Sequence, residues 1–400
     1  MPKRVVLAYS GGLDTSVAVK WMADNYGVEV VALAVNVGQD GGATDEAAII
    51  DRARAAGAVE AEVVDARAEF ASEYLVPALQ ANALYEGKYP LVSALSRPVI
   101  AKHLVAAAKR YGADAVAHGC TGKGNDQVRF EVSTRALDPA LDVLAPVREW
   151  GMTREDCIHY AYDNGIPITA TKEKVYSIDD NLWGRAIECG EMEDPWAVPP
   201  PGVWSLTTPT ASEPRDVEIA FVEGVPVAVD GEELDLVALI ERVGSIVGSY
   251  GCGRLDMVEN RRVGIKSRET YECPSGLALI AAHGELESIC HERDLAREKQ
   301  RLEIRYAELV YDGLWFSPLK QALDAFIADT QKVVTGEVRL HLEPGSCRVT
   351  GRRSPYSLYD YSLATYDAAD AFRHQDSAGF VRLWGLSVET WSAKQGPGSK

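Results

Sequence analysis

A nine-residue stretch near the N-terminus, Ala8-Tyr-Ser-Gly-Gly-Leu-Asp-Thr-Ser16, constrains the fold more than any other part of the chain. An apolar run, Val5 to Ala8, leads into it and is typical of a buried strand, whereas the apolar residues from Val17 to Met22 have the spacing of one helix face. The stretch is therefore predicted to lead from a strand into a helix. Backbone N–H groups at a helix N-terminus attract anions, and two adjacent glycines let the backbone approach one closely. We interpret it as a phosphate-binding loop.

The stretch departs from the two commonest nucleotide-binding patterns. Gly11 and Gly12 are followed by Leu13 and not by the lysine of the G-x-x-x-x-G-K-[ST] pattern. The pair Gly122-Lys123 does not complete that pattern elsewhere, because Ala117 stands where its first glycine is required. The dinucleotide pattern G-x-G-x-x-G is also absent after the first strand. The alternative, a Ser-Gly-Gly sequence that only turns the chain, leaves the hydroxyls of the stretch unexplained.

Composition limits the class of protein and its partners. The 400 residues suggest two domains with small appendages, and the net charge of −18 disfavours nucleic acid as a partner. The seven cysteines are scattered without a Cys-x-x-Cys pair, which fits free thiols in a reducing cytoplasm better than disulfides or a zinc site. The chain has no run of 18 apolar residues and no signal sequence, so we expect a cytoplasmic protein that makes no membrane contact.

Up to about residue 167, strand-like and helix-like segments alternate. Such alternation predicts an α/β domain, a doubly wound parallel sheet with helices on both faces. Within it, Ser96-Arg97-Pro98 is predicted to open a helix and Thr153 to Asp156 to form a capping box. Ligands of such sheets bind beyond the carboxyl ends of the strands. We therefore expect three loops that follow strands to meet at one cleft: Ser10–Ser16, Asn36–Gly42 and Gly119–Asn125.

The remainder of the chain predicts a second, α+β domain. Residues 168–214 are rich in proline and are predicted to be mostly connecting loop. Hairpins are expected over 217–229 and at Pro344-Gly345, with helices between them. The last segment, 378–393, carries large apolar residues whose exposure would be costly, among them Phe380, Leu383, Trp384, Leu386, Val388 and Trp391, so we predict that it docks on another subunit.

A second polar loop lies between His118 and Arg129, directly after a predicted short strand. Arg129 is suited to bind a carboxylate through two parallel hydrogen bonds, and Asp126 to bind an ammonium group. Thr121 and Asn125 add neutral hydrogen-bonding groups. The combination indicates a pocket for a zwitterionic amino acid, although an ordinary polar turn would have the same composition.

These motifs together resemble a known family. The first loop alone is similar to the pyrophosphate-binding loop of the ATP pyrophosphatases. With Gly119 to Glu131, Asp179 to Arg185, Val258 to Arg261 and Gly264 to Arg268, the whole chain resembles the argininosuccinate synthase family. The resemblance implies that citrulline and aspartate are joined to argininosuccinate while ATP yields AMP and pyrophosphate, through a citrullyl-adenylate and with Mg²⁺. It also implies a homotetramer with a C-terminal helical arm, and domains at 1–167, 168–366 and 367–400.

The resemblance assigns site residues position by position. It implies that ATP is bound by Ala8, Tyr9, Ser10, Gly11, Gly12, Leu13, Asp14, Thr15, Ser16, Val35 and Gly119. It implies that aspartate is bound by Thr121, Asn125 and Asp126, and citrulline by Tyr89, Ser93, Asn125, Arg129, Ser177, Ala186, Glu259 and Tyr271. Ser10, Asp14 and Asp126 are the expected catalytic residues.

Two positions depart from the family's pattern, which often has serine where this chain has Ala94 and Ala186. Ser93 is expected to replace the first hydroxyl, and a backbone group or a water the second. For Asp14 two roles stay open, a ligand of Mg²⁺ or a cap of the helix.

Two other functions stay open from the residues alone. An ATP pyrophosphatase that modifies tRNA needs a cysteine pair or a basic surface, and the sequence has no sign of either. A nucleotide-binding sensor without chemistry needs only the first loop and leaves the second polar loop without a role.

Overall fold

The computed structural model describes residues 2–39, 45–168 and 176–397. The chain divides into two compact units, Met1–Tyr356 and Ser357–Lys400. The predicted loop Asn36–Gly42 is described only as far as residue 39, so the rest of that prediction lies outside the described residues.

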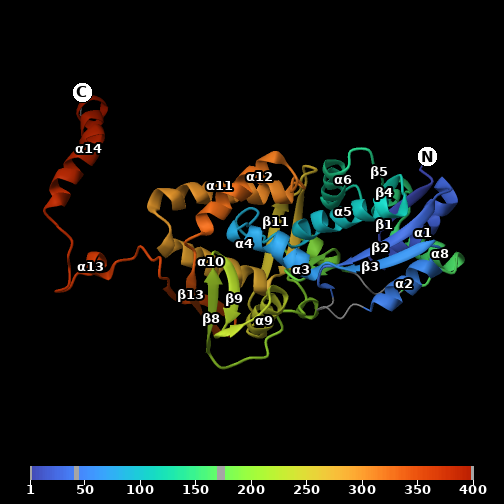
Figure 1. The fold of residues 1–400 in the computed structure, drawn as a ribbon, viewed down its shortest axis with the longest axis horizontal. Helices are drawn as coiled ribbons and strands as arrows, with labels where there is room; N and C mark the ends of the chain where they lie inside the picture. The colour runs from blue at the N-terminus through green and yellow to red at the C-terminus, as the bar shows by residue number, and fades with distance from the viewer. Residues whose placement is uncertain (1, 40–44, 169–175, 398–400) are drawn as a thin grey trace. The chain divides into compact units, whose positions relative to one another are not determined.

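The N-terminal part of the first unit is built on a parallel sheet, as predicted (Figure 1). Its strand order is β3-β2-β1-β4-β5, and every neighbouring pair runs parallel. The strands are β1 Arg4–Ala8, β2 Glu29–Asn36, β3 Glu60–Asp65, β4 Ala115–Ala117 and β5 Asp142–Leu144. The helical segments of this part are α1 Leu13–Tyr26, α2 Glu46–Ala55, α3 Arg67–Glu69, a π-helical turn Phe70–Leu75, α4 Val76–Gln80, α5 Val92–Tyr111, α6 Asp126–Leu137, α7 Pro146–Glu149 and α8 Arg154–Asp163.

Alternate residues of β1 face opposite layers of helices. Val5 and Leu7 pack in one core with side chains of α1 and α8, whereas Val6 packs in another with side chains of α5. Both faces are buried, which explains why the strand is an uninterrupted apolar run rather than an alternating one. The α/β class with helices on both faces is confirmed.

One predicted helix boundary was wrong and another is confirmed. The helix expected to open at Ser96 begins at Val92, and Pro98 lies inside it. Residues 92–95 are buried, so their packing outweighs the one backbone hydrogen bond that a proline cannot donate. Thr153 does form the predicted capping box with Asp156, each side chain accepting a hydrogen bond from the other residue's backbone N–H.

The rest of the first unit contains two antiparallel sheets, with strand orders β10-β9-β8-β13-β14 and β11-β12-β7-β6. Both predicted hairpins are confirmed, β8–β9 through Glu223-Gly224 and β13–β14 through Pro344-Gly345. The strands are β6 Ser177–Asn181, β7 Gly184–Glu188, β8 Arg215–Val222, β9 Val225–Val229, β10 Glu232–Glu233, β11 Arg254–Asn260, β12 Lys266–Glu272, β13 Gly336–Glu343 and β14 Ser346–Arg353. The helices are the 3-10 turns Gly190–Glu193 and Pro201–Val203, α9 Leu236–Ser249, α10 Pro274–Cys290, α11 Arg293–Tyr311 and α12 Pro318–Gln331.

The prediction that 168–214 is mostly loop was wrong for residues 177–188. These form the hairpin β6–β7, and β7 pairs with β12. The polar run of β6 gives no alternating pattern, so its strand state is revealed only by its pairing with β7. The tip of the hairpin packs back on the first half of the chain, because Trp183 donates its indole N–H to Pro90 O at 2.9 Å and Leu182 N–H bonds Val37 O at 2.9 Å.

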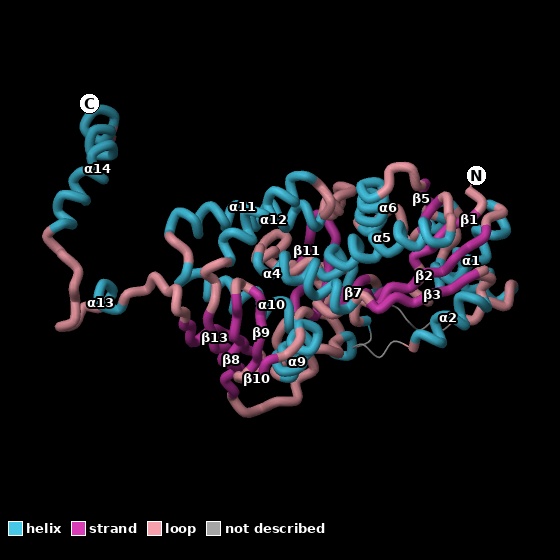
Figure 2. Tube along the Cα trace, in the orientation of Figure 1, coloured by secondary structure: helices cyan, strands magenta, loops and turns pink. Residues whose placement is uncertain are grey.

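The second unit, Ser357–Lys400, is mainly helical where it is described. It contains the short helix α13 Tyr361–Ala364 and the long helix α14 Asp376–Gln395, both drawn as helix in Figure 2. The predicted C-terminal helix is therefore confirmed. None of the helices in the described ranges is at once long and apolar enough to cross a bilayer.

Candidate active site

The phosphate-binding loop joins the end of β1 to the start of α1. Gly11 has φ +72°, a left-handed conformation that favours glycine. Gly12 occupies the N-cap without a side-chain hydrogen bond, so Asp14 is not the cap, and that alternative was wrong. Residues 13–15 have no intrahelical acceptor for their N–H groups, which leaves these donors available to an anion.

Hydroxyl groups of the loop pair with one another. Ser10 Oγ lies 3.0 Å from Thr15 Oγ1, and the Tyr9 hydroxyl lies 2.9 Å from Ser16 Oγ. Arg52 of α2 donates to Gly11 O at 2.8 Å. The guanidinium therefore adds positive charge beside the loop, a contribution that sequence reasoning missed because Arg52 lies 41 residues away on another helix.

Asp14 lies in the first turn of α1 and is half-buried. Burial raises the pKa of its carboxyl, and the positive charge of Arg154 opposes that rise. Asp14 remains the carboxylate of the loop that could contact a metal ion. The described residues contain no cluster of three or more His, Cys, Asp or Glu suited to a metal.

The second polar loop begins at β4, the strand next to β1. The chain leaves β1 for the face covered by α1, whereas α6, which follows β4, contributes Phe130 to the core on the other face. This is a topological switch point, where open α/β sheets bind ligands. The two loops are in contact, because a Cβ added to Gly119 would lie 2.9 Å from Thr15 Cγ2.

At the start of α6, Asp126 is held between two arginines. Arg129 Nη1 donates to its Oδ1 at 2.9 Å, and Arg97 Nε and Nη2 donate to its Oδ2 at 2.9 and 2.8 Å. Arg97 also donates to Asp179 Oδ2 of β6 at 2.6 Å. Burial alone would raise the pKa of the Asp126 carboxyl, but the two guanidinium groups outweigh it and lower the pKa to about 2. Asp126 is therefore ionised at neutral pH.

A ring of tyrosines surrounds Glu259 of β11. Tyr271 and Tyr311 donate their hydroxyls to its two carboxylate oxygens, at 3.0 and 2.7 Å. Tyr89 stacks on Tyr271 with a centroid distance of 4.2 Å. Burial raises the pKa of Glu259, whereas the phenol donors and the charge of Arg129 lower it. The group forms a buried, hydrogen-bonded wall.

Most of the residues predicted to bind aspartate or citrulline, which together we call the acceptor site, are joined in one network. Asn125 donates its amide to the Tyr311 hydroxyl at 2.8 Å and thereby connects the second loop with Glu259. The Ser93 N–H donates to the Tyr89 hydroxyl at 3.0 Å. The connected residues are Tyr89, Ser93, Asn125, Asp126, Arg129, Glu259 and Tyr271.

The remaining predicted site residues are outside this network, and the sheet pairing or the chain position gives their places. Ala186 is buried and pairs with Tyr271 across β7 and β12, and the exposed Ser177 pairs with Glu188 across β6 and β7. Thr121 is exposed in the second loop. Val35 is buried near the end of β2.

Sequence reasoning missed three residues of this site. Arg97 was interpreted as part of a helix start, and Asp179 only as part of a motif. Tyr311, the last residue of α11, resembles an ordinary core aromatic. The sequence signal at Arg97 was its position next to a proline in an otherwise apolar segment, where a charge is costly unless it is paired.

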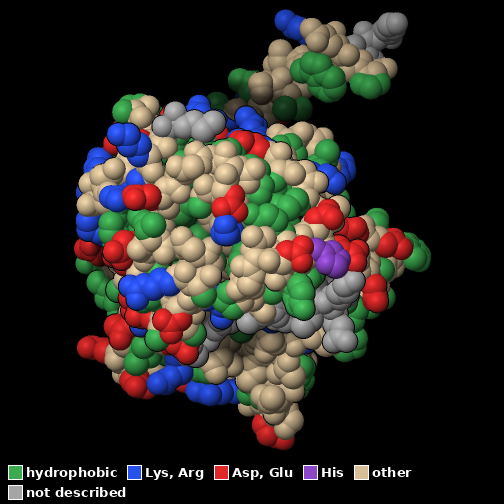
Figure 3. Space-filling model, turned by 90° about the vertical axis from the view of Figure 1, so that its right-hand side faces the viewer, with side chains coloured by type: hydrophobic (Ala, Val, Ile, Leu, Met, Phe, Trp, Pro, Cys, Tyr) green, Lys and Arg blue, Asp and Glu red, His purple; other side chains and the backbone are tan. Residues whose placement is uncertain are grey.

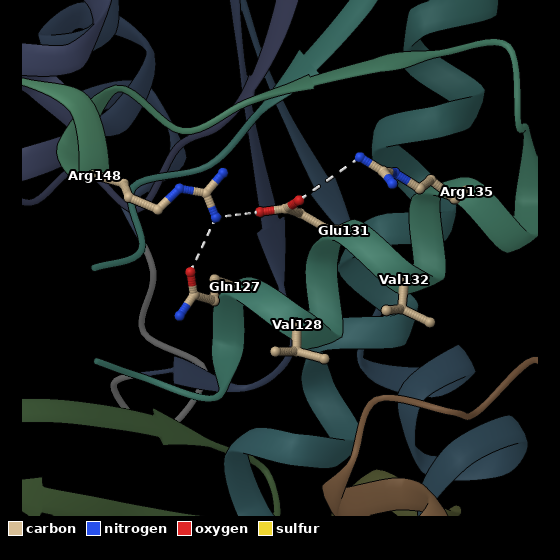
Figure 4. A pocket seen from close by; sticks show the side chains of 6 residues that line it. All are labelled: Gln127, Val128, Glu131, Val132, Arg135 and Arg148. Atoms are coloured by element: carbon tan, nitrogen blue, oxygen red, sulfur yellow. Dashed lines mark hydrogen bonds and ion pairs between the residues drawn. The ribbon is translucent and has the colours of Figure 1, made fainter. Parts of the chain in front are cut away.

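The outer side of α6 supports the second loop. Figure 4 shows a shallow hollow in which Arg148 reaches Glu131 and Gln127 of α6. Arg148 Nη1 donates to Gln127 Oε1 at 3.0 Å, and the Gln127 amide donates to Gly122 O and Gly124 O at 2.7 and 3.1 Å. The side chain of Gln127 thus anchors the glycine-rich loop to α6. None of the residues predicted to bind substrate lines this hollow, and the contacts within it support the second loop.

Basic and acidic side chains are interspersed on the face of the molecule drawn in Figure 3. That face shows no continuous basic area of the kind that nucleic-acid binding requires.

Comparisons with known proteins agree over almost the whole chain. Residues 4–167 match the family described as the arginosuccinate synthase N-terminal HUP domain, and residues 176–391 match the arginosuccinate synthase C-terminal domain. The argininosuccinate synthase of Symbiobacterium thermophilum is 57% identical over 396 residues, covering 98% of each chain. That of Bacillus pumilus is 56% identical over 390 residues, covering 97% of this chain and 96% of its own.

Proposed function

The chain belongs to the argininosuccinate synthase family, and from this premise we propose that it joins L-citrulline to L-aspartate while ATP is cleaved to AMP and pyrophosphate. The observation that carries the proposal is the contact between two loops at the switch point of the sheet. One offers backbone N–H groups and hydroxyls to phosphate, and the other offers paired charges to an amino acid.

The chemistry requires activation of citrulline. A ureido oxygen is a poor leaving group, so the reaction proceeds in two steps. The oxygen attacks the α-phosphorus of ATP, the bond to the β-phosphate breaks, and pyrophosphate leaves. The amine of aspartate then attacks the ureido carbon of the citrullyl-adenylate, and AMP leaves with the former ureido oxygen. Alignment of three substrates supplies part of the acceleration, and such alignment is worth up to about 7–11 kcal/mol in model reactions.

We assign the first loop, residues 8–16, with Val35 and Gly119, to ATP. Ser10 hydrogen-bonds the departing pyrophosphate in this proposal, and Asp14 is the carboxylate of the loop that would help to hold Mg²⁺. Bound there, Mg²⁺ would neutralise the charge that develops on pyrophosphate. The first-turn N–H groups of α1 and the charge of Arg52 act on the same phosphates.

We assign Thr121, Asn125 and Asp126 to aspartate. An ionised Asp126 is suited to bind an ammonium group, and its low pKa keeps it ionised at any pH where the enzyme works. Citrulline is assigned to Asn125, Arg129 and the remaining residues of the predicted set, which are Tyr89, Ser93, Ser177, Ala186, Glu259 and Tyr271. Ala186 brings no hydroxyl, so a backbone group or a water takes that contact.

We also propose a homotetramer assembled through the C-terminal arm, a cytoplasmic location, and domains at 1–167, 168–366 and 367–400. Exposed apolar side chains on α14 support the tetramer. The seven cysteines, which are all free, support the cytoplasmic location. The separate family matches over 4–167 and 176–391 support the first domain boundary.

Isotope tracing tests the two-step route. Citrulline labelled with ¹⁸O in the ureido group is incubated with ATP, aspartate and the enzyme, and the AMP is analysed by mass spectrometry. The proposal predicts one ¹⁸O in the AMP, because the ureido oxygen stays on phosphorus. Unlabelled AMP would contradict it.

A further inference from the structure

Tyr311 is buried at the end of α11, yet its hydroxyl reaches two residues of the acceptor site. It donates to Glu259 Oε1 at 2.7 Å and accepts from Asn125 Nδ2 at 2.8 Å. A carboxylate oxygen can only accept, so the phenol proton lies toward Glu259 and a phenol lone pair faces Asn125. The oxygen of the Asn125 side-chain amide is used as well, because Arg262 N–H donates to Asn125 Oδ1 at 2.8 Å. The orientation of the amide is therefore determined.

The same residue also fixes the guanidinium of Arg129. Arg129 Nε donates to the backbone carbonyl of Tyr311 at 3.0 Å, and its guanidinium carbon lies 4.9 Å from the centroid of the Tyr311 ring. The ring itself is stacked on Tyr85, with centroids 3.5 Å apart and planes 5° apart. Tyr311 is 1% exposed, so little solvent competes for these contacts.

We propose that Tyr311 is a positioning residue of the acceptor site, holding Asn125, Glu259 and Arg129 in the orientation that receives the ureido amino acid. The inference rests on the proposed function and deepens it. No nearby stretch of sequence brings these three residues together, since they come from the start of α6 and from β11. Tyr311 lies at the end of α11, and its side chain links the start of α6 with β11.

Glu259 gives the proposal a pH signature. The groups acting on this carboxylate are the phenols of Tyr311 and Tyr271 and the charges of Arg129, Arg261 and Glu269. A phenol that donates to the ionised carboxylate stabilises that form. Removal of the Tyr311 hydroxyl therefore raises the pKa of Glu259, and protonation of Glu259 then occurs at higher pH.

The test compares Tyr311→Phe with Tyr306→Phe. Tyr306 is a matched control, because it is also buried in α11 and its hydroxyl donates to Asp324 at 3.2 Å, away from the acceptor residues. Steady-state rates are measured with citrulline varied at saturating ATP and aspartate, between pH 5.5 and 9, and melting temperatures are measured alongside.

For Tyr311→Phe we expect kcat/KM for citrulline to fall about tenfold or more, the usual effect of losing a hydrogen bond to a charged group. The KM for ATP should stay unchanged, and the acidic limb of the kcat/KM profile should move to higher pH. Tyr306→Phe should match the wild type in kcat/KM for citrulline, in the KM for ATP and in the pH profile. Wild-type citrulline kinetics in Tyr311→Phe would overturn the inference, as would an equal loss toward every substrate with a melting temperature below that of Tyr306→Phe. A wild-type enzyme that forms no AMP with citrulline and aspartate would instead refute the proposed function.

Discussion

At the scale of single residues, Asp126 is half-buried and fully paired. Its two oxygens accept hydrogen bonds from Arg97 and Arg129, and Arg97 also bonds Asp179. Two positive and two negative charges thus balance within the cluster. Such a group stabilises the fold only while it stays ionised.

The ionisation of Asp126 predicts a pH-dependent contribution to stability. Its pKa is about 2 in the folded state against about 3.9 for an unperturbed aspartate, so the contribution is complete above about pH 5 and declines as the pH falls toward 2. Asp126→Asn should be about 2 kcal/mol less stable than the wild type at pH 7, and this difference should shrink by roughly half by pH 3. Urea unfolding of both proteins at one concentration, across that range, measures it. A difference independent of pH would contradict this account.

Individual site residues were predictable where a motif carried them. The Ser-Gly-Gly turn follows β1 and the Asn125-Asp126 pair ends the loop that follows β4, so local sequence and sheet topology were enough to place them at the switch point. Arg97 and Tyr311 had no such signal, because their roles come from partners 29 and 186 residues away, Asp126 and Asn125. A propensity for helix says nothing about those partners.

At the scale of elements, β2 and the hairpin β6–β7 meet at Gly38. This glycine has φ +93°, and a Cβ there would lie 2.9 Å from both N and Cβ of Leu182. The backbone bond from Leu182 N to Val37 O forms at the same place. The hairpin is thus anchored just beyond the end of β2 by this contact, in addition to the bond from Trp183 to Pro90 O.

Gly38→Ala should therefore lower the free energy of unfolding by about 3 kcal/mol, the sum of backbone strain and overpacking. Gly27→Ala is the matched control, because Gly27 also has positive φ, +67°, but a Cβ there would meet nothing within 4 Å. That variant should lose only about 1 kcal/mol. Equal losses in the two variants, measured by urea unfolding, would show that the contact with Leu182 contributes nothing.

The elements themselves were predicted unevenly, for physical reasons. The parallel strands are buried on both faces and so appear as apolar runs, and the hairpins at Glu223-Gly224 and Pro344-Gly345 have clear turn residues. Strand β6 has the sequence Ser-Ile-Asp-Asp-Asn, which neither alternates nor forms an apolar run. Its strand state depends on pairing with β7, so the residues within it could not reveal it.

At the scale of the whole molecule, the second unit predicts that copies of the chain associate. Large apolar side chains of α14 are exposed, among them Phe380 at 61%, Leu383 at 74% and Trp384 at 77%. Covering so many apolar groups favours association. Deleting residues 378–400 should convert the proposed tetramer to smaller species in light scattering, whereas deleting only 396–400 should leave its mass unchanged. A tetramer that survives the longer deletion would refute the role of the arm.

The account as a whole rests on an acceptor site placed beside an ATP-cleaving loop. The most direct measurement follows nucleotide products by chromatography in reactions that contain ATP and Mg²⁺ with citrulline, aspartate, both or neither. We expect stoichiometric AMP, pyrophosphate and argininosuccinate only when both amino acids are present. Release of ADP, or no ATP cleavage with both amino acids present, would contradict it.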